Sequence, residues 1–199
     1  MASSKEERVL DAARQLFLEN GFAATSVDKV AKLADVSKAT LYAHFEDKKA
    51  LFREVVRRAT LEYSSRVFNE SELDQGEISD VLFQVARNLL NILKSVDGKR
   101  LFRLAISESE RHPDIGRSFF EFGPDLATRR LETLLRDRTR RGELEIPDPY
   151  LAAHQFGELC KAEVFYRTMF NLASPPTASE LELYARRAVT TFLRAYRAT

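Results

Sequence analysis

Residues 26–45 read SVDKVAKLADVSKATLYAHF. The stretch contains two short helical patterns, and each follows a Ser whose hydroxyl can accept a hydrogen bond from a first-turn amide. Ser26 is the expected cap of the first helix, with Thr25 as an alternative, and Ser37 is the expected cap of the second. Between them, Asp35-Val36 is expected to form a tight turn. The pattern predicts a helix-turn-helix, with the second helix ending at about Phe45.

The second of these helices has two chemically different faces. With Leu41 placed inward and 100° turned per residue, Phe45 also points inward and Ala39 points outward. The outer face and its edges are small, polar and free of acidic side chains: Lys38, Ala39, Thr40, Tyr42, Ala43 and His44. Such a face suits the major groove of DNA, because alanine methyls can meet thymine methyls and hydroxyls can bond phosphate oxygens. Spacing alone leaves open two ordinary core helices with a solvated face.

Phosphate contacts are expected on both sides of this helix. Lys48 and Lys49 follow it and offer positive charge to the DNA backbone. Thr25 or Ser26, with the amides at the start of the first helix, offers a second phosphate contact.

Helical patterns continue in both directions along the chain. Before the quoted stretch, residues 5–20 repeat apolar side chains at helical spacing, and Asn20-Gly21 is a stop signal. After it, we expect helices over 48–68, 78–96, 99–111, 113–122, 125–141, 149–172 and 179–196, with a loop over 69–77. The expected breaks include Asp97-Gly98 and Gly123-Pro124. The predicted fold is all-α with about nine helices.

Composition limits the choices without deciding among them. The chain has 199 residues, 44% of them hydrophobic, and a net charge of +1, so bulk charge gives no sign of a nucleic-acid partner. The least polar long stretch, 150–172, carries four charges, which argues against a membrane span. Cys160 has no second cysteine to pair with, which favours a cytoplasmic protein, and it is expected to be a small buried hydrophobe rather than a redox sensor.

Enzymatic signatures are missing from the sequence. It has no G-x-S-x-G, G-x-G-x-x-G, phosphate-loop or H-E-x-x-H motif, and its three histidines fall in separate helical regions. His154 and Glu158 are four apart but are too few for a metal site. We therefore expect no catalysis, no metal and no cofactor. A helical protein-interaction adaptor that does not bind DNA is the main alternative.

Three segments in register, AARQLFLENGF (12–22), TSVDKVAKLADVSKATLYAHF (25–45) and DKKALF (47–52), resemble the N-terminal domain of the tetracycline-repressor (TetR) family. The resemblance implies a DNA-binding domain over residues 1–50 and a ligand-binding and dimerisation domain over 51–199. It also implies a homodimer that reads a palindromic operator in double-stranded DNA. Such a protein is usually a repressor that a small ligand releases from DNA, and an activator is the alternative. The implied positions at or near DNA are Thr25, Ser26, Ser37, Lys38, Thr40, Tyr42, His44 and Lys48, to which the helical geometry adds Ala39. Asp35 and Ala39 depart from the family, which commonly has Gly at both places.

The rest of the chain supports two further expectations. The last two helices, about 149–172 and 179–196, are the expected dimer interface, because the first is apolar on more than one face and the second has a complete apolar stripe. A small apolar or amphipathic ligand is expected in a pocket of aromatic walls and a few polar groups. Its candidate lining residues are Phe83, Phe102, Arg103, Phe119, Phe122, Gln155, Phe156, Phe165 and Tyr166. Ordinary core packing is the alternative for each of these aromatics.

Overall fold

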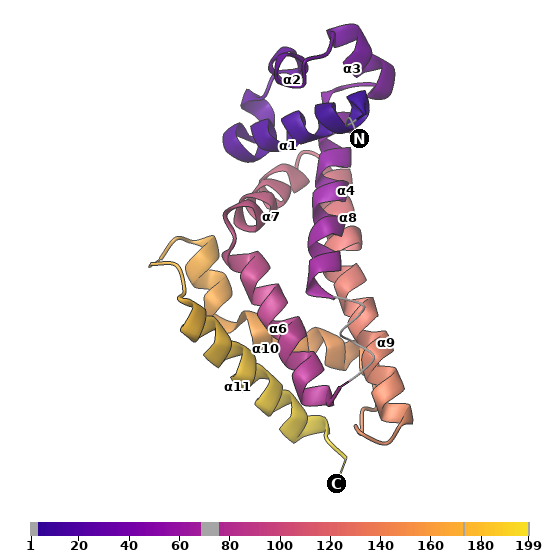
Figure 1. Cartoon of the computed structure of the whole chain (residues 1–199), viewed down its shortest axis with the longest axis vertical. Coiled ribbons are helices and arrows are strands. Elements are labelled where there is room, and N and C mark those ends of the chain that lie inside the picture. The colour runs from indigo at the N-terminus through magenta and orange to yellow at the C-terminus, as the bar shows by residue number, and fades with distance from the viewer. Residues whose placement is uncertain (1–3, 69–75, 173, 199) are drawn as a thin grey trace. The chain divides into compact units, whose positions relative to one another are not determined.

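The computed structural model describes residues 4–68, 76–172 and 174–198, and these ranges are helical almost throughout (Figure 1). The helices are α1 (Lys5–Ala24), α2 (Val27–Leu33), α3 (Lys38–His44), α4 (Lys48–Val67), α6 (Ile78–Lys94), α7 (Val96–Ser109), α8 (Pro113–Phe120), the π-helical η1 (Glu121–Asp125), α9 (Leu126–Arg140), α10 (Pro149–Met169) and α11 (Ala178–Tyr196). The predicted all-α class is confirmed. Most of the loop expected over 69–77 lies outside the described residues. None of the helices in the described ranges is long and apolar enough to cross a membrane.

The chain divides into two compact units. Unit 1 takes in the chain up to Glu62 together with Arg100–Phe122, and unit 2 takes in Tyr63–Lys99 together with the chain from Gly123 onward. The functional boundary expected at residue 50 stays a prediction.

Helix α1 begins at Lys5, as the sequence predicts, but it continues past the expected stop at Asn20-Gly21 to Ala24. Ser4 and Glu7 form a capping box, in which the Ser4 hydroxyl accepts from the Glu7 amide at 3.1 Å and the Glu7 carboxylate accepts from the Ser4 amide at 2.8 Å. Gly21 interrupts the helix with φ of 81°, a conformation that an L side chain rarely adopts. Between them, the apolar face is buried, and Phe17 packs on Phe52 of α4 with ring centroids 4.8 Å apart.

The turn between α2 and α3 depends on a left-handed residue that is not glycine. Asp35 has φ of 52°, as expected for an Asp in a position where Gly is common. Its amide donates to the Lys32 carbonyl at 3.2 Å, and the amide of Val36 donates to the Ala31 carbonyl at 3.1 Å. The turn therefore satisfies the carbonyls at the end of α2 while it redirects the chain into α3.

Replacing Asp35 with Val should destabilise this turn. A β-branched side chain in the left-handed region costs about 1–2 kcal/mol, and we expect the free energy of unfolding in urea to fall by that amount. Asp35→Gly is the matched control, since Gly adopts this φ freely, and its unfolding free energy should stay within about 0.5 kcal/mol of the parent. Equal stability of the Val and Gly variants would contradict the account of this turn.

Unit 2 is built around α6, α10 and α11, which pack together in a single apolar cluster (Figure 1). The α11 stripe seen in the sequence is buried here, through Leu181, Ala185 and Phe192 among others. Phe156 of α10 meets Phe192 edge to face, with ring centroids 5.1 Å apart. The stripe on α11 therefore belongs largely to the core of its own subunit.

The predicted break at Asp97-Gly98 is wrong. The chain leaves the helix at Ser95, whose ψ is 146°, and α7 starts at once with Val96. The Ser95 hydroxyl accepts from the Gly98 amide at 3.0 Å and so caps α7. Gly98 is inside the first turn, where a Cβ would lie 2.3 Å from the Ile92 carbonyl oxygen. Gly98 permits this close approach because it has no side chain, and it does not end a helix.

The predicted stop at Gly123-Pro124 is also wrong. The chain passes from α8 through the π-helical turn η1 into α9, with Pro124 inside that turn. Proline cannot donate to the regular hydrogen-bond ladder, and the wider turn accommodates it with one extra residue.

Helix α10 differs from its expected form in two ways. It ends at Met169, three residues before the expected Leu172, and Asn171 follows with φ of 52°. Inside the helix, Ala162 departs from helical geometry with φ of 34° and ψ of −137°. Its N-terminus is as predicted, because Asp148 accepts from the Leu151 amide at 3.0 Å and Pro149 occupies the first helical position.

Cys160 lies in the core of unit 2 and is fully buried. Burial raises the pKa of its thiol to about 12. A thiol with this pKa is almost wholly protonated at neutral pH, so Cys160 behaves as the small buried hydrophobe that the sequence predicts.

Candidate nucleic-acid interface

Both helices of the motif begin at the serines that the sequence indicates. The Ser26 hydroxyl accepts from the Lys29 amide at 3.2 Å, and the Ser37 hydroxyl accepts from the Thr40 amide at 3.0 Å. The alternative cap, Thr25, is wrong: the residue is 2% exposed, and its hydroxyl donates to the Leu16 carbonyl at 3.0 Å and to the Gly21 carbonyl at 2.8 Å, both in α1. The Thr25 hydroxyl therefore serves the fold and not a phosphate contact.

Helix α3 presents the two faces that its sequence predicts. Leu41 and Phe45 are buried and hold the helix against α1 and α2. Thr40 is half-buried, and its hydroxyl lies 2.9 Å from that of Ser37. The remaining candidate residues of this helix are exposed: Ser37, Lys38, Ala39, Tyr42 and His44. The outer face is therefore accessible over its whole length, with Tyr42 (44% exposed) as its largest side chain.

Lys38 is paired with a carboxylate that the sequence reasoning did not consider. Its Nζ lies 2.8 Å from Oδ1 of Asp28, in the first turn of α2. The hydrogen bond and the negative charge of Asp28 raise the pKa of the Lys38 ammonium. The pairing joins residues ten apart across a turn, and only the folded motif brings them together.

Lys48 makes contacts within the fold in addition to the phosphate contact that the sequence predicts. Its ammonium donates to the Ala23 carbonyl at 3.2 Å and lies 4.5 Å from the centre of the Phe22 ring. Partial burial lowers its pKa. Lys48 thus joins the start of α4 to the end of α1, and the sequence offered no signal for this contact.

A second contact missed by sequence reasoning supports the turn of the motif. Arg8, on α1, donates from its guanidinium to the backbone carbonyl of Asp35. The same group lies 3.7 Å from the Asp35 carboxylate. Arg8 therefore connects α1 to the left-handed turn that orients α3.

The candidate ligand-pocket residues fall into two groups, one in each unit. Phe102, Arg103, Phe119 and Phe122 belong to unit 1, where the rings of Phe102 and Phe119 meet edge to face at 5.5 Å. The other five belong to unit 2: Phe83, Gln155, Phe156, Phe165 and Tyr166. In this second group Phe156 is buried in the core, whereas Gln155 and Tyr166 are exposed. The side chain of Gln155 accepts from the Tyr196 hydroxyl.

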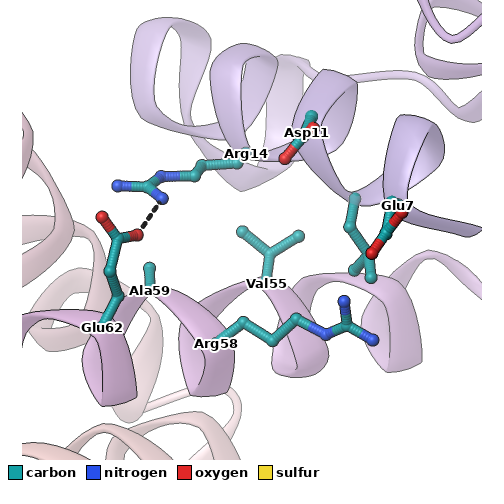
Figure 2. Close-up of a pocket in the computed structure, with 8 residues that line it drawn as sticks. Glu7, Asp11, Arg14, Val55, Arg58, Ala59 and Glu62 are labelled. Carbon is teal, nitrogen blue, oxygen red and sulfur yellow. Dashed lines mark hydrogen bonds and ion pairs between the residues drawn. The ribbon is translucent and has the colours of Figure 1, made fainter. Parts of the chain in front are cut away.

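The structure also has a cleft of about 290 Å³ between α1 and α4 in unit 1, which none of these candidates lines (Figure 2). Its floor is apolar and its walls are charged: Glu7, Leu10, Asp11, Arg14, Val55, Arg58, Ala59 and Glu62. Arg14 lies 2.5 Å from Glu62 at one end, and Arg58 pairs with Glu6 at 2.7 Å. These cross-helix ion pairs hold α1 against α4, and the cleft is not the mainly apolar pocket expected for a ligand.

Apolar side chains remain exposed on the last two helices and just beyond α10. They are Tyr150, Leu151, Leu159, Tyr166, Phe170, Leu172 and Leu183. Phe170 has 66% of its surface exposed, although an aromatic side chain gains much from burial. The second apolar face that the sequence indicates on the α10 segment is thus present and uncovered within one subunit.

Two family models match the chain and together span most of it. The one described as "Bacterial regulatory proteins, tetR family" matches residues 9–55. The one described as "AefR-like transcriptional repressor, C-terminal domain" matches residues 80–198, which is more than half of the chain.

Solved structures agree with both matches. A structure from Mesorhizobium loti, described as a TetR-family transcriptional regulator, is 30% identical with a TM-score of 0.91, and the match covers 98% of this chain and 97% of that one. The "Flavonoid-responsive Regulator FrrA" is 37% identical with a TM-score of 0.82 and 97% coverage of both chains. Among curated relatives, the negative transcriptional regulator IcaR of Staphylococcus aureus is 29% identical over 79 residues. That match spans 40% of this chain and 42% of IcaR.

Proposed function

Because the chain belongs to the TetR family of bacterial transcriptional regulators, we propose that it binds a palindromic operator as a homodimer and represses transcription until a small ligand releases it. The exposed, acid-free outer face of α3 is the observation that carries this proposal. Repression is favoured over activation because the C-terminal match is described as a repressor domain and IcaR is a negative regulator.

In this proposal α3 lies in the major groove. Ala39 and Ala43 allow the backbone to approach base edges, while Tyr42 and Thr40 offer hydroxyls to the phosphates. Ser26 and Lys48 make further backbone contacts on either side. Leu41 and Phe45 fix the helix from behind, so its outer face is presented rigidly to DNA.

The exposed apolar residues on α10, just beyond it and on α11 support the proposed dimer. A second copy would cover Tyr166, Phe170 and Leu183 across a two-fold axis, while the α11 stripe stays in the subunit core. A dimer of this kind presents two copies of α3, and a two-fold symmetric protein reads a palindromic site.

The organisation of unit 1 supports a route for release by a ligand. The segment Arg100–Phe122 belongs to the same compact unit as the helix-turn-helix. Asp114 of α8 pairs with Lys49 at 3.1 Å and with Arg53 at 3.6 Å on α4. A ligand that displaced this segment would therefore disturb α4, the helix that follows α3, which is the recognition helix in this proposal. FrrA is described as flavonoid-responsive, which supports a small amphipathic aromatic molecule as the ligand class.

A gel-shift assay with the DNA upstream of the gene tests the proposed function. We expect a retarded band at nanomolar protein that weakens steeply as salt rises, because binding releases counterions from the phosphates. No salt-sensitive shift at micromolar protein would contradict the proposal. A pulldown that recovers protein partners and no DNA would favour a helical adaptor.

A further inference from the structure

Asp28 and Lys38 form an ion pair on the face of the motif proposed to meet DNA. The ammonium of Lys38 lies 2.8 Å from the carboxylate, and the two side chains are 53% and 70% exposed. Residues 26–44 contain two acidic side chains, Asp28 and Asp35. Asp35 faces Arg8 on α1, so Asp28 is the acidic residue of this stretch that pairs with the recognition helix.

The fold has little need of this pair. Exposed ion pairs contribute about 0–1 kcal/mol, because water and salt screen them. Buried apolar side chains from both helices hold α2 and α3 together, with Val30, Ala31 and Leu41 at or below 5% exposure. Removing the carboxylate should therefore leave the motif folded, so that a change in DNA affinity can be measured without a change in stability.

The position of the pair matters more for DNA than for folding. A free lysine beside the duplex adds one phosphate contact, and each such contact strengthens binding to any sequence. A lysine whose ion pair with a carboxylate must first break adds less affinity, and the unpaired carboxylate then repels the phosphates. Like charges placed opposite each other in an interface weaken binding, and every duplex presents the same phosphates to this carboxylate.

We propose that Asp28 is a negative determinant of DNA affinity, which acts through Lys38 and restrains it from binding DNA phosphates. The inference rests on the proposed function, since it assumes that α3 faces DNA. It assigns to Asp28 an unfavourable contribution to DNA affinity, although Asp28 itself makes no favourable contact with DNA.

A double-mutant cycle tests this role on a mixed-sequence duplex, with affinity measured by fluorescence anisotropy over a series of salt concentrations. The four proteins are the parent, Asp28→Asn, Lys38→Gln and the double variant. Asp28→Asn should tighten binding roughly fivefold at low salt and steepen the slope of log K against log salt by about 0.9. In the Lys38→Gln background, the same substitution should produce less than half of that gain. Unfolding midpoints should be equal for all four proteins.

Asp80→Asn is the matched control, because Asp80 is an exposed acidic residue in the first turn of α6 in unit 2. It changes net charge equally and should alter affinity much less than Asp28→Asn. A gain from Asp80→Asn as large as that from Asp28→Asn would overturn the proposal. A gain from Asp28→Asn that is undiminished with Gln at position 38 would also overturn it, because Asp28 would then act by simple repulsion. If none of the proteins binds DNA in a salt-dependent way, the proposed function itself fails, and this inference fails with it.

Discussion

Replacing Ala39 with Glu should lower affinity for operator DNA about a hundredfold or more, because a carboxylate would then face the bases and the negatively charged phosphates. Ala39 is exposed on the outer face of α3, so the longer side chain meets no protein atom that it must displace. The helix should tolerate Glu, which is a good helix former. We therefore expect a protein that unfolds at the parent's temperature and does not bind DNA.

Ala178→Glu is the control for this prediction. Ala178 is the first residue of α11 and is also exposed, and the substitution adds the same charge at a helix N-terminus in unit 2. Its affinity for DNA, measured by anisotropy at the same salt, should stay within a few fold of the parent. If Ala39→Glu retained the parent's affinity, the outer face of α3 could not be the surface that meets DNA.

Replacing Phe156 with Ala should lower the free energy of unfolding by about 3–5 kcal/mol, the usual cost of deleting a buried aromatic ring. Phe156 is 1% exposed and packs edge to face on Phe192 in the core shared by α6, α10 and α11. Removal of the ring leaves a cavity among helices that cannot close completely around it. Chemical denaturation followed by circular dichroism measures the loss.

Phe120→Ala is the matched control, because Phe120 is half exposed on α8. This substitution should cost well under 1 kcal/mol. An equally small effect at Phe156 would show that the ring is not part of a tightly packed core. It would then strengthen the alternative that Phe156 lines a ligand pocket.

Local signals in the sequence were sufficient for the motif itself. Ser26 and Ser37 cap the two helices, Asp35 takes the left-handed turn, and Leu41 and Phe45 point inward. Each of these features depends on residues within four positions of one another, so side-chain type and periodicity predict them directly.

Contacts between distant residues were not predictable in this way. Asp28 and Lys38 meet only after the turn forms, and Lys48 reaches the end of α1 from the start of α4. The Thr25 hydroxyl likewise donates to the Leu16 carbonyl, nine residues earlier in the chain.

The wrong helix breaks share a different cause. Gly98 and Pro124 were interpreted as local stops, but each has another role in the fold. Gly98 allows the first turn of α7 to approach the end of α6, and Pro124 is accommodated by a π-helical turn. Glycine and proline restrict what the backbone can do without stating which of several compatible structures it adopts.

Selection from a random-sequence duplex library is the most direct test of the central claim, that two copies of α3 read DNA together. The purified protein is mixed with the library, bound duplexes are recovered through several rounds, and the enriched pool is sequenced. We predict a palindromic motif whose half-site centres are separated by about one helical turn of DNA or a multiple of it. The Ala39→Glu protein should enrich no such motif. A parent protein that enriched no motif, or one that enriched a motif without two-fold symmetry, would contradict the account.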